Sequence, residues 1–114
     1  MKKISSDEQF RAAIAAQGLT IAVFKAGWCV DCHFIDPFMP ELVEQYADRA
    51  VFVEIDRDEP SDICSELNIL GIPSFIAFSD GKELVRFVSK LRKNRAEIEQ
   101  FVDRAISVYA VLKA

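Results

Sequence analysis

Runs of hydrophobic residues predict five β-strands along the chain. The run from Thr20 to Lys25 is short, apolar and partly β-branched, which is typical of a strand buried on both faces of a parallel sheet. Asp80-Gly81 is a strong hairpin signal, so the last two strands are expected to be antiparallel neighbours. The other strands are predicted at residues 3–4, 50–56, 74–78 and 83–88.

Hydrophobic residues at helical spacing predict a helix after each of the first three strands and another after the last. Pro37 is expected to kink the second helix, and Pro40 to weaken or restart it. The order βαβαβαββα implies an α/β fold, in which helices flank both faces of a central mixed sheet. A chain of this length is expected to form a single domain, residues 1–114. The helices are predicted at residues 7–17, 30–46, 60–67 and from 95 onward.

Two cysteines lie where the central strand is expected to turn into the second helix. Cys29 falls at the predicted helix N-terminus, and Cys32 lies one turn further on the same face. A helix N-terminus presents unpaired N–H groups that stabilise an anion, and the thiolate is the nucleophilic form of cysteine. We therefore expect Cys29 to attack a disulfide and Cys32 to resolve the mixed disulfide that results.

The segment Trp28-Cys29-Val30-Asp31-Cys32 resembles the active-site motif of the thioredoxin family, and Gly71-Ile72-Pro73-Ser74 resembles its cis-proline loop. The closest resemblance is to bacterial thioredoxin-like proteins with a Trp-Cys-x-Asp-Cys motif. It implies a thioredoxin fold over nearly the whole chain and a protein-disulfide reductase that needs no bound cofactor. Its implied partners are disulfide-containing proteins and an NADPH-dependent flavoprotein reductase. Trp28, Ile72 and Pro73 would form the substrate-binding surface, with a cis Ile72–Pro73 bond and Ile72 pairing with substrate backbone.

Three residues depart from the usual pattern of the family. Val23 and Phe52 stand where a buried aspartate and a lysine are usual, and Ser89 replaces a glycine beside the cis-proline loop. The usual base for Cys32 is therefore missing. Three substitutes stay open: Asp31, Glu54 and water.

Two residues beside the cysteines are expected to tune them. The charge of Asp31 opposes a nearby thiolate, which would make the disulfide harder to reduce. His33 would favour a thiolate when protonated, or would simply be a solvated helix residue.

Other uses of the cysteine pair have weaker support. Zinc would need more ligands than Cys29 and Cys32 provide, and only His33 and Cys64 could join them, so no metal is expected. The run from Cys29 to His33 also matches the attachment motif of c-type haem. Its context argues against haem, because the motif follows a buried strand and the sequence shows no export signal. Cys64 is expected to be a buried helix residue, with a regulatory disulfide as its alternative. The second functional hypothesis is a protein-binding module with a vestigial dithiol.

Composition narrows the class of protein. The 114 residues are 51% hydrophobic, which excludes a disordered chain, and carry a net charge of −4. No basic cluster stands apart from acidic neighbours, so nucleic acid is not an expected partner, and Lys90 to Arg95 is expected to be a solvated loop. No apolar run approaches the roughly 20 residues of a membrane helix. The odd number of cysteines and the absence of an apolar leader favour a cytoplasmic protein. We also expect it to be a monomer.

Overall fold

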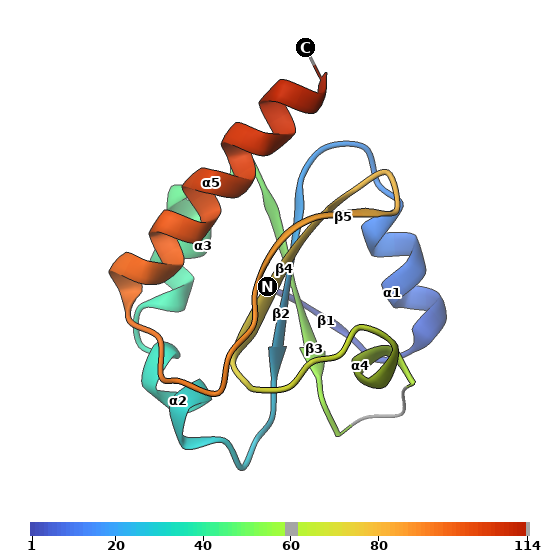
Figure 1. Cartoon of the computed structure of the whole chain (residues 1–114). Helices are drawn as coiled ribbons and strands as arrows, with labels where there is room; N and C mark the ends of the chain where they lie inside the picture. Colours follow the sequence, from blue (N-terminus) through green and yellow to red (C-terminus); the bar gives the residue numbers. More distant parts are fainter. Residues whose placement is uncertain (59–61, 114) are drawn as a thin grey trace.

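The Thr20–Lys25 run is the middle strand of one mixed sheet, as its hydrophobicity predicts. The computed structural model describes residues 1–58 and 62–113. The strand order is β1-β3-β2-β4-β5, with β1, β3 and β2 parallel and with β4 and β5 antiparallel to their neighbours (Figure 1). The strands are β1 (Lys2–Ile4), β2 (Thr20–Lys25), β3 (Val51–Asp56), β4 (Ser74–Ser79) and β5 (Lys82–Phe87).

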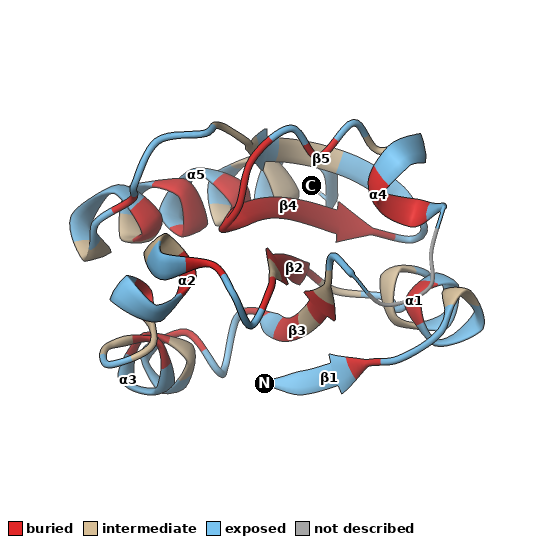
Figure 2. Cartoon of the chain, turned by 90° about the horizontal axis from the view of Figure 1, so that it is seen from below, coloured by how far each residue is buried: buried red, intermediate tan, exposed pale blue. Residues whose placement is uncertain are grey.

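Helices cover both faces of this sheet, so the expected α/β thioredoxin fold is confirmed. Figures 1 and 2 show α1 and α4 on one side, with α3 and α5 on the other. Each side has its own hydrophobic core: Phe10 meets Phe78 edge-on at 5.7 Å between ring centroids, and Phe75 lies 6.2 Å from Phe101. The helices are α1 (Asp7–Ile14), α2 (Val30–Ile35), α3 (Met39–Gln45), α4 (Ile63–Glu66) and α5 (Arg95–Lys113).

The predicted helix over residues 30–46 is two helices, so the order of elements is βαβααβαββα. Pro37 lies between them, because it has no N–H to continue the hydrogen-bond ladder of α2. Phe38 N instead donates to Ile35 O in a tight turn at 3.2 Å. Pro40 lies in the first turn of α3, where the missing N–H has no helical partner to lose, so the helix restarts there.

The first helix is shorter than predicted, and the β4–β5 turn donates hydrogen bonds to carbonyls at and just after its C-terminus. α1 ends at Ile14 rather than residue 17. The carbonyl of Ile14 accepts from Gly81 N at 2.8 Å, and that of Ala16 accepts from Asp80 N at 3.2 Å. Both turn residues have positive φ, 53° at Asp80 and 80° at Gly81, as the predicted hairpin requires.

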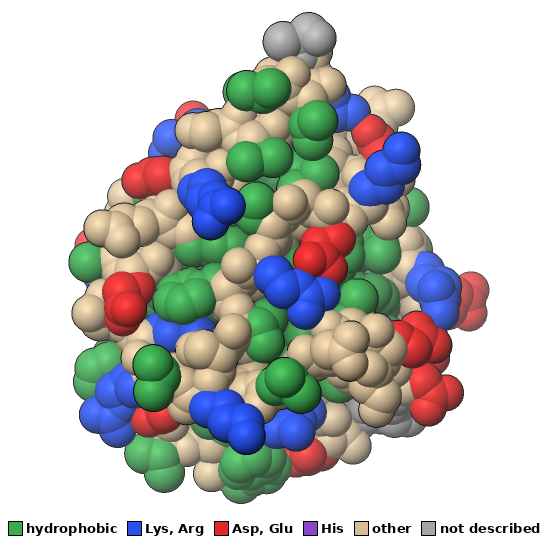
Figure 3. Space-filling model, in the orientation of Figure 1, with side chains coloured by type: hydrophobic (Ala, Val, Ile, Leu, Met, Phe, Trp, Pro, Cys, Tyr) green, Lys and Arg blue, Asp and Glu red, His purple; other side chains and the backbone are tan. Residues whose placement is uncertain are grey.

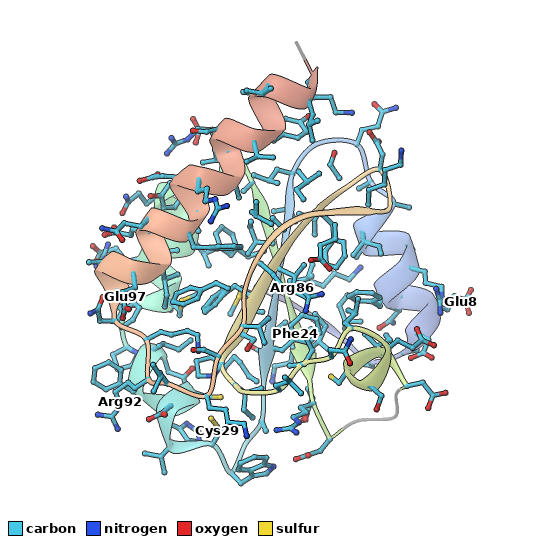
Figure 4. All side chains as sticks on the ribbon, viewed as in Figure 1. Glu8, Phe24, Cys29, Arg86, Arg92 and Glu97 are labelled. Carbon is cyan, nitrogen blue, oxygen red and sulfur yellow. The ribbon has the colours of Figure 1, made fainter. Side chains whose placement is uncertain are left out.

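The described part of the predicted helix over residues 60–67 is α4, and Pro60 lies outside the described residues. Within residues 1–58 and 62–113, no helix combines the length and the apolar character needed to cross a membrane. β2 leads to the segment that contains the cysteine pair, and Cys29 lies at the lower end of the molecule in Figure 4.

Candidate active site

Cys29 is the N-cap residue of α2, one of the first residues after β2. Its backbone is extended, with φ −84° and ψ 112°, so its sulfur folds back over the first helical turn. Cys29 Sγ accepts a hydrogen bond from Cys32 N at 3.1 Å, an interaction that stabilises negative charge on the sulfur. Cys29 and Cys32 are both buried, with 6% and 1% of their surfaces exposed. The structure therefore brings the predicted pair together as two free thiols.

The second predicted motif lies against the first. The thiol of Cys29 is 3.6 Å from the carbonyl oxygen of Ile72, and the Ile72–Pro73 peptide bond is cis, as the resemblance implies. Ser74 Oγ donates to the carbonyl of Gly71 and so closes the loop on itself. The loop therefore holds a backbone carbonyl beside the sulfur of Cys29.

The surroundings of Cys32 make its thiol hard to ionise. Burial, followed by its hydrogen bond with Cys29, raises the pKa of the Cys32 thiol to about 12. The backbone of Ala26 and the charge of Lys25 act in the opposite direction but do not outweigh burial. At neutral pH Cys32 is therefore a thiol, and it needs a proton acceptor before it can attack.

Exposed apolar side chains lie in the segments that carry the site and in the loop beside it. Trp28 is 63% exposed, and its indole N–H donates to Asp58. Val30, Leu70 and Leu91 are also largely exposed. Figure 3 shows hydrophobic side chains, interspersed with Lys and Arg, gathered at this lower end of the molecule. Exposed apolar patches of this kind mark interaction surfaces.

Asp31 is paired with a residue that the sequence does not place near it. Arg92 Nε donates to Asp31 Oδ1 at 2.9 Å, and the guanidinium lies 4.5 Å from the ring centroid of Phe34. Figure 4 shows Arg92 and Cys29 at the same end of the molecule. Arg92 therefore offsets the negative charge that was expected to oppose the thiolate.

This pairing limits the effect of Asp31 on the redox couple. Asp31→Asn is expected to raise the reduction potential of the Cys29–Cys32 couple by only about 10 mV, the size of an exposed charge interaction. Arg92→Gln should lower the potential by a similar amount, because it leaves the carboxylate unpaired beside the thiols. Equilibrium titration against glutathione measures both. A rise well above about 30 mV in Asp31→Asn would show that Arg92 does not offset the charge.

Three charged residues that were not predicted to act together form a network behind the cysteines. Lys25 Nζ donates to Asp36 Oδ1 at 2.6 Å and to Glu54 Oε1 at 3.5 Å. Burial disfavours the ammonium, but the hydrogen bond to Asp36 and the charge of Glu54 outweigh it and raise the pKa of Lys25. A signal was present in the sequence: a lysine ends an otherwise apolar strand at a position that faces inward.

His33 is bound at both ring nitrogens, although its side chain is exposed. Nε2 is 2.7 Å from the carbonyl of Gly27, and Nδ1 is 3.1 Å from Asp36 Oδ2. Both partners are acceptors, so this geometry suits the imidazolium, and the carbonyl and the carboxylate raise the pKa of His33. His33 therefore ties α2 to the loop before Cys29 and is more than a solvated helix residue.

The prediction of a solvated loop over residues 90–95 is wrong for Lys93, which is 1% exposed. Its ammonium donates to the carbonyls of Ser89 at 3.1 Å and Leu91 at 2.9 Å, and lies 5.2 Å from the ring centroid of Phe87. Burial lowers the pKa of Lys93, while Asp31 and the other acidic groups nearby act to raise it. The ammonium of Lys93 therefore fixes the loop beside Gly71 from its buried side.

Two of the three departures from the family pattern lie in the hydrophobic core, and the third lies beside the cis-proline loop. Val23 and Phe52 are buried in the core on the α3 and α5 side, with 0% and 3% exposure, and hold no charge for Cys32. The backbone of Ser89 lies directly against Gly71, where a Cβ would come within 2.1 Å of the Ser89 carbonyl oxygen. Cys64 is buried on α4, and burial raises the pKa of its thiol, so it is a poor nucleophile. Within the described residues, no three acidic, histidine or cysteine side chains are arranged to hold a metal ion.

Comparisons with known proteins agree with this geometry. The family model described as Thioredoxin matches residues 1–104. The thioredoxin of Callithrix jacchus is 35% identical over 105 residues, which cover 90% of this chain and 99% of that protein. The thioredoxin of Homo sapiens is 31% identical over 108 residues, with 93% and 99% covered. The crystal structure of thioredoxin from Trypanosoma brucei brucei is similar at a TM-score of 0.81 and 30% identity, covering 92% of this chain and 89% of that one.

Proposed function

The chain belongs to the thioredoxin family, and on this premise we propose that it is a thiol–disulfide oxidoreductase that mainly reduces protein disulfides. The observation that carries the proposal is the sulfur of Cys29, which accepts the N–H of Cys32 at 3.1 Å and faces the Ile72 carbonyl. A cysteine with a donor on its sulfur and a second thiol within one helical turn can exchange disulfides and then release the product.

Each cysteine has a separate role in this proposal. The Cys29 thiolate attacks one sulfur of a substrate disulfide, and the other sulfur leaves as a thiolate. Cys32 then attacks Cys29, which forms the Cys29–Cys32 disulfide and frees the second substrate sulfur. The substrate gains two electrons and two protons, and the protein is left oxidised. No bound cofactor takes part in either exchange.

Substrate docking is assigned to the apolar surface beside the cysteines. The exposed ring of Trp28 supports a role in contact with substrate. Ile72 supports another, because its carbonyl lies beside Cys29 and substrate backbone arriving there would pass next to the sulfur. Pro73 follows directly and is buried, so it would hold the loop in place while substrate binds.

The remaining assignments extend the same proposal. The substrates are proteins that contain disulfides, and an NADPH-dependent flavoprotein reductase returns the protein to its dithiol form. The odd number of cysteines favours a reducing compartment, so we assign the protein to the cytoplasm, as a monomer with one domain. The Trp-Cys-x-Asp-Cys motif favours a bacterial source.

A turnover assay on a model protein disulfide tests the proposal. The protein is expected to reduce many equivalents of insulin disulfide with dithiothreitol as the electron source. The rate should exceed that of dithiothreitol alone, because the positioned Cys29 is a better nucleophile. Stoichiometric capture of the substrate without turnover would contradict the proposal and favour a binding module.

A further inference from the structure

Resolution of the mixed disulfide requires a proton acceptor for Cys32. Cys32 is 1% exposed, so bulk water has little access to its side chain. The thiol has a pKa of about 12, raised first by burial and then by Cys29, so only a very small fraction ionises at neutral pH without help. A group near Cys32 that takes the proton would remove this barrier.

A pocket of about 210 Å³ lies beside Cys32, and the two acidic residues of the network behind the cysteines also line it. This volume is several times the roughly 30 Å³ that one water molecule occupies, and the charged side chains in its lining offer hydrogen-bond partners for water. The lining residues are Lys3, Lys25, Ala26, Gly27, Cys32, His33, Asp36, Glu54 and Asp56.

Among the two acids bound to Lys25, Glu54 is the better proton acceptor. Asp36 is the tighter partner of Lys25, at 2.6 Å, and also contacts His33 at 3.1 Å. Burial acts to raise the pKa of Asp36, but the hydrogen bond and charge of Lys25 outweigh it and lower the pKa, so its carboxylate is a weak base. Glu54 meets Lys25 only at 3.5 Å, and its side chain is 22% exposed, so its oxygens can accept a proton without losing a close ion pair.

We propose that Glu54 takes the proton of Cys32 through a water molecule in this pocket. The inference rests on the proposed function and adds the step by which the mixed disulfide is resolved. The S–H bond of Cys32 breaks, its proton passes through the water to the Glu54 carboxylate, and the thiolate attacks Cys29. The Cys29–Cys32 bond forms as the bond to substrate breaks, and the substrate sulfur leaves with the electron pair. The proton on Glu54 returns to solvent through the open side of the pocket.

Lys25 positions this acceptor. Its ammonium holds Glu54 on the pocket side of β3, while Asp36 balances its charge from the end of α2. The same ammonium favours the thiolate of Cys32 electrostatically. The charged or titratable groups around Cys32 are Lys3, Lys25, His33, Asp36, Glu54 and Asp56 in the pocket, with Cys29, Asp31 and Lys93 on the other side.

The test is the rate of resolution in Glu54→Gln, which keeps the shape of the side chain and removes its basicity. A mixed disulfide between Cys29 and a chromogenic aryl thiol is formed, and release of the thiol is followed by stopped flow. Resolution is expected to slow by at least about tenfold near neutral pH, while the preceding attack by Cys29 stays within about twofold. The variant rate should then rise about tenfold per pH unit, because hydroxide must remove the proton, whereas the wild-type rate should rise less steeply.

Three further variants make the result specific. Glu54→Asp keeps a carboxylate and should recover part of the rate, which a merely structural role of Glu54 would not predict. Glu44→Gln removes the same charge from an exposed position outside the pocket and should resolve at the wild-type rate. Asp36→Asn should slow resolution less than Glu54→Gln. A larger effect at Asp36, or a wild-type rate and pH profile in Glu54→Gln, would overturn the assignment.

The proposed function has a separate point of failure. If the wild-type protein does not form or resolve the mixed disulfide at all, the reductase proposal fails before Glu54 is tested. If wild-type resolution is fast and Glu54→Gln matches it, only the inference about Glu54 fails.

Discussion

Replacing Cys32 with serine is expected to abolish turnover and to leave the protein covalently attached to its substrates. The serine hydroxyl occupies nearly the same space as the thiol but cannot attack the mixed disulfide, because an alkoxide at neutral pH is far rarer than a thiolate. Cys29 keeps its helical cap, since the N–H at position 32 is a backbone group and still donates to its sulfur. The first exchange therefore proceeds, and the second does not.

Mass spectrometry and non-reducing gels measure this outcome directly. Cys32→Ser incubated with a model disulfide protein should form a 1:1 adduct that dithiothreitol dissolves, and turnover should fall by at least about 10³-fold. Cys29→Ser should form neither adduct nor product. Cys64→Ser is the matched control, because Cys64 is buried on α4, outside the Cys29–Cys32 motif, and it should keep wild-type turnover.

The assignment of roles would be wrong if Cys29→Ser formed the adduct and Cys32→Ser did not. Burial argues against that result: Cys32 has only 1% of its surface exposed, and burial raises the pKa of its thiol to about 12. Turnover that survives in both variants would show that the chemistry does not lie at this pair.

The strands and the cysteine pair could be predicted because each depends on local pattern. The buried strand Thr20–Lys25 leads directly into Cys29, so a hydrophobic run followed by helical spacing indicates both the middle of the sheet and the place of the pair. The Asp80-Gly81 turn could likewise be predicted from its two residues alone, because both residue types tolerate the positive φ angles that the turn requires.

The electrostatics of the site could not be predicted, because they depend on residues that only the fold brings together. Arg92 reaches Asp31 across 61 residues of sequence, and Glu54 reaches Lys25 across 29. The hydrophobic pattern placed Glu54 on a strand but gave no reason to prefer it to Asp31 as a base. The fold separates them, because Asp31 is paired with Arg92 while Glu54 faces the pocket beside Cys32.

Lys93 shows that the charge of a side chain does not by itself predict whether the side chain is exposed. A lysine in a basic stretch is usually solvated, yet this one points inward, where two backbone carbonyls and an aromatic ring take the place of water. Those acceptors belong to the loop that contains Ser89 and Leu91, whose path is not evident from the residues themselves.

Gly71→Ala is expected to destabilise the protein by about 3 kcal/mol, at the upper end of the usual cost of overpacking. A Cβ at this position would lie 2.1 Å from the carbonyl oxygen of Ser89, 2.5 Å from its carbonyl carbon and 2.8 Å from Lys90 Cα. All three atoms are backbone, so no side chain can rotate out of the way. Urea unfolding of the reduced protein measures the change in free energy.

Gly27→Ala is the matched control, because it makes the same chemical change at another loop glycine near the cysteines. A Cβ there would meet no atom within 4 Å, and Gly27 does not have a positive φ. Its free energy of unfolding should therefore stay within about 0.5 kcal/mol of wild type. Equal losses in both variants would mean that the contact with Ser89 does not limit this loop.

Gly71→Ala should also affect the active site, because the Ser89 side of the contact cannot move away. Ser89 O is held by the buried ammonium of Lys93, so the loop from residue 89 to residue 93 resists displacement. The strain then falls on the 71–74 loop, which includes the Ile72 carbonyl 3.6 Å from Cys29. Gly71→Ala should therefore slow the attack of Cys29 on a protein disulfide more than its attack on a small disulfide, since only a protein substrate uses that backbone for docking. Equal slowing of the two reactions would contradict this prediction. It would show that the contact stabilises the loop without affecting the docking of protein substrates.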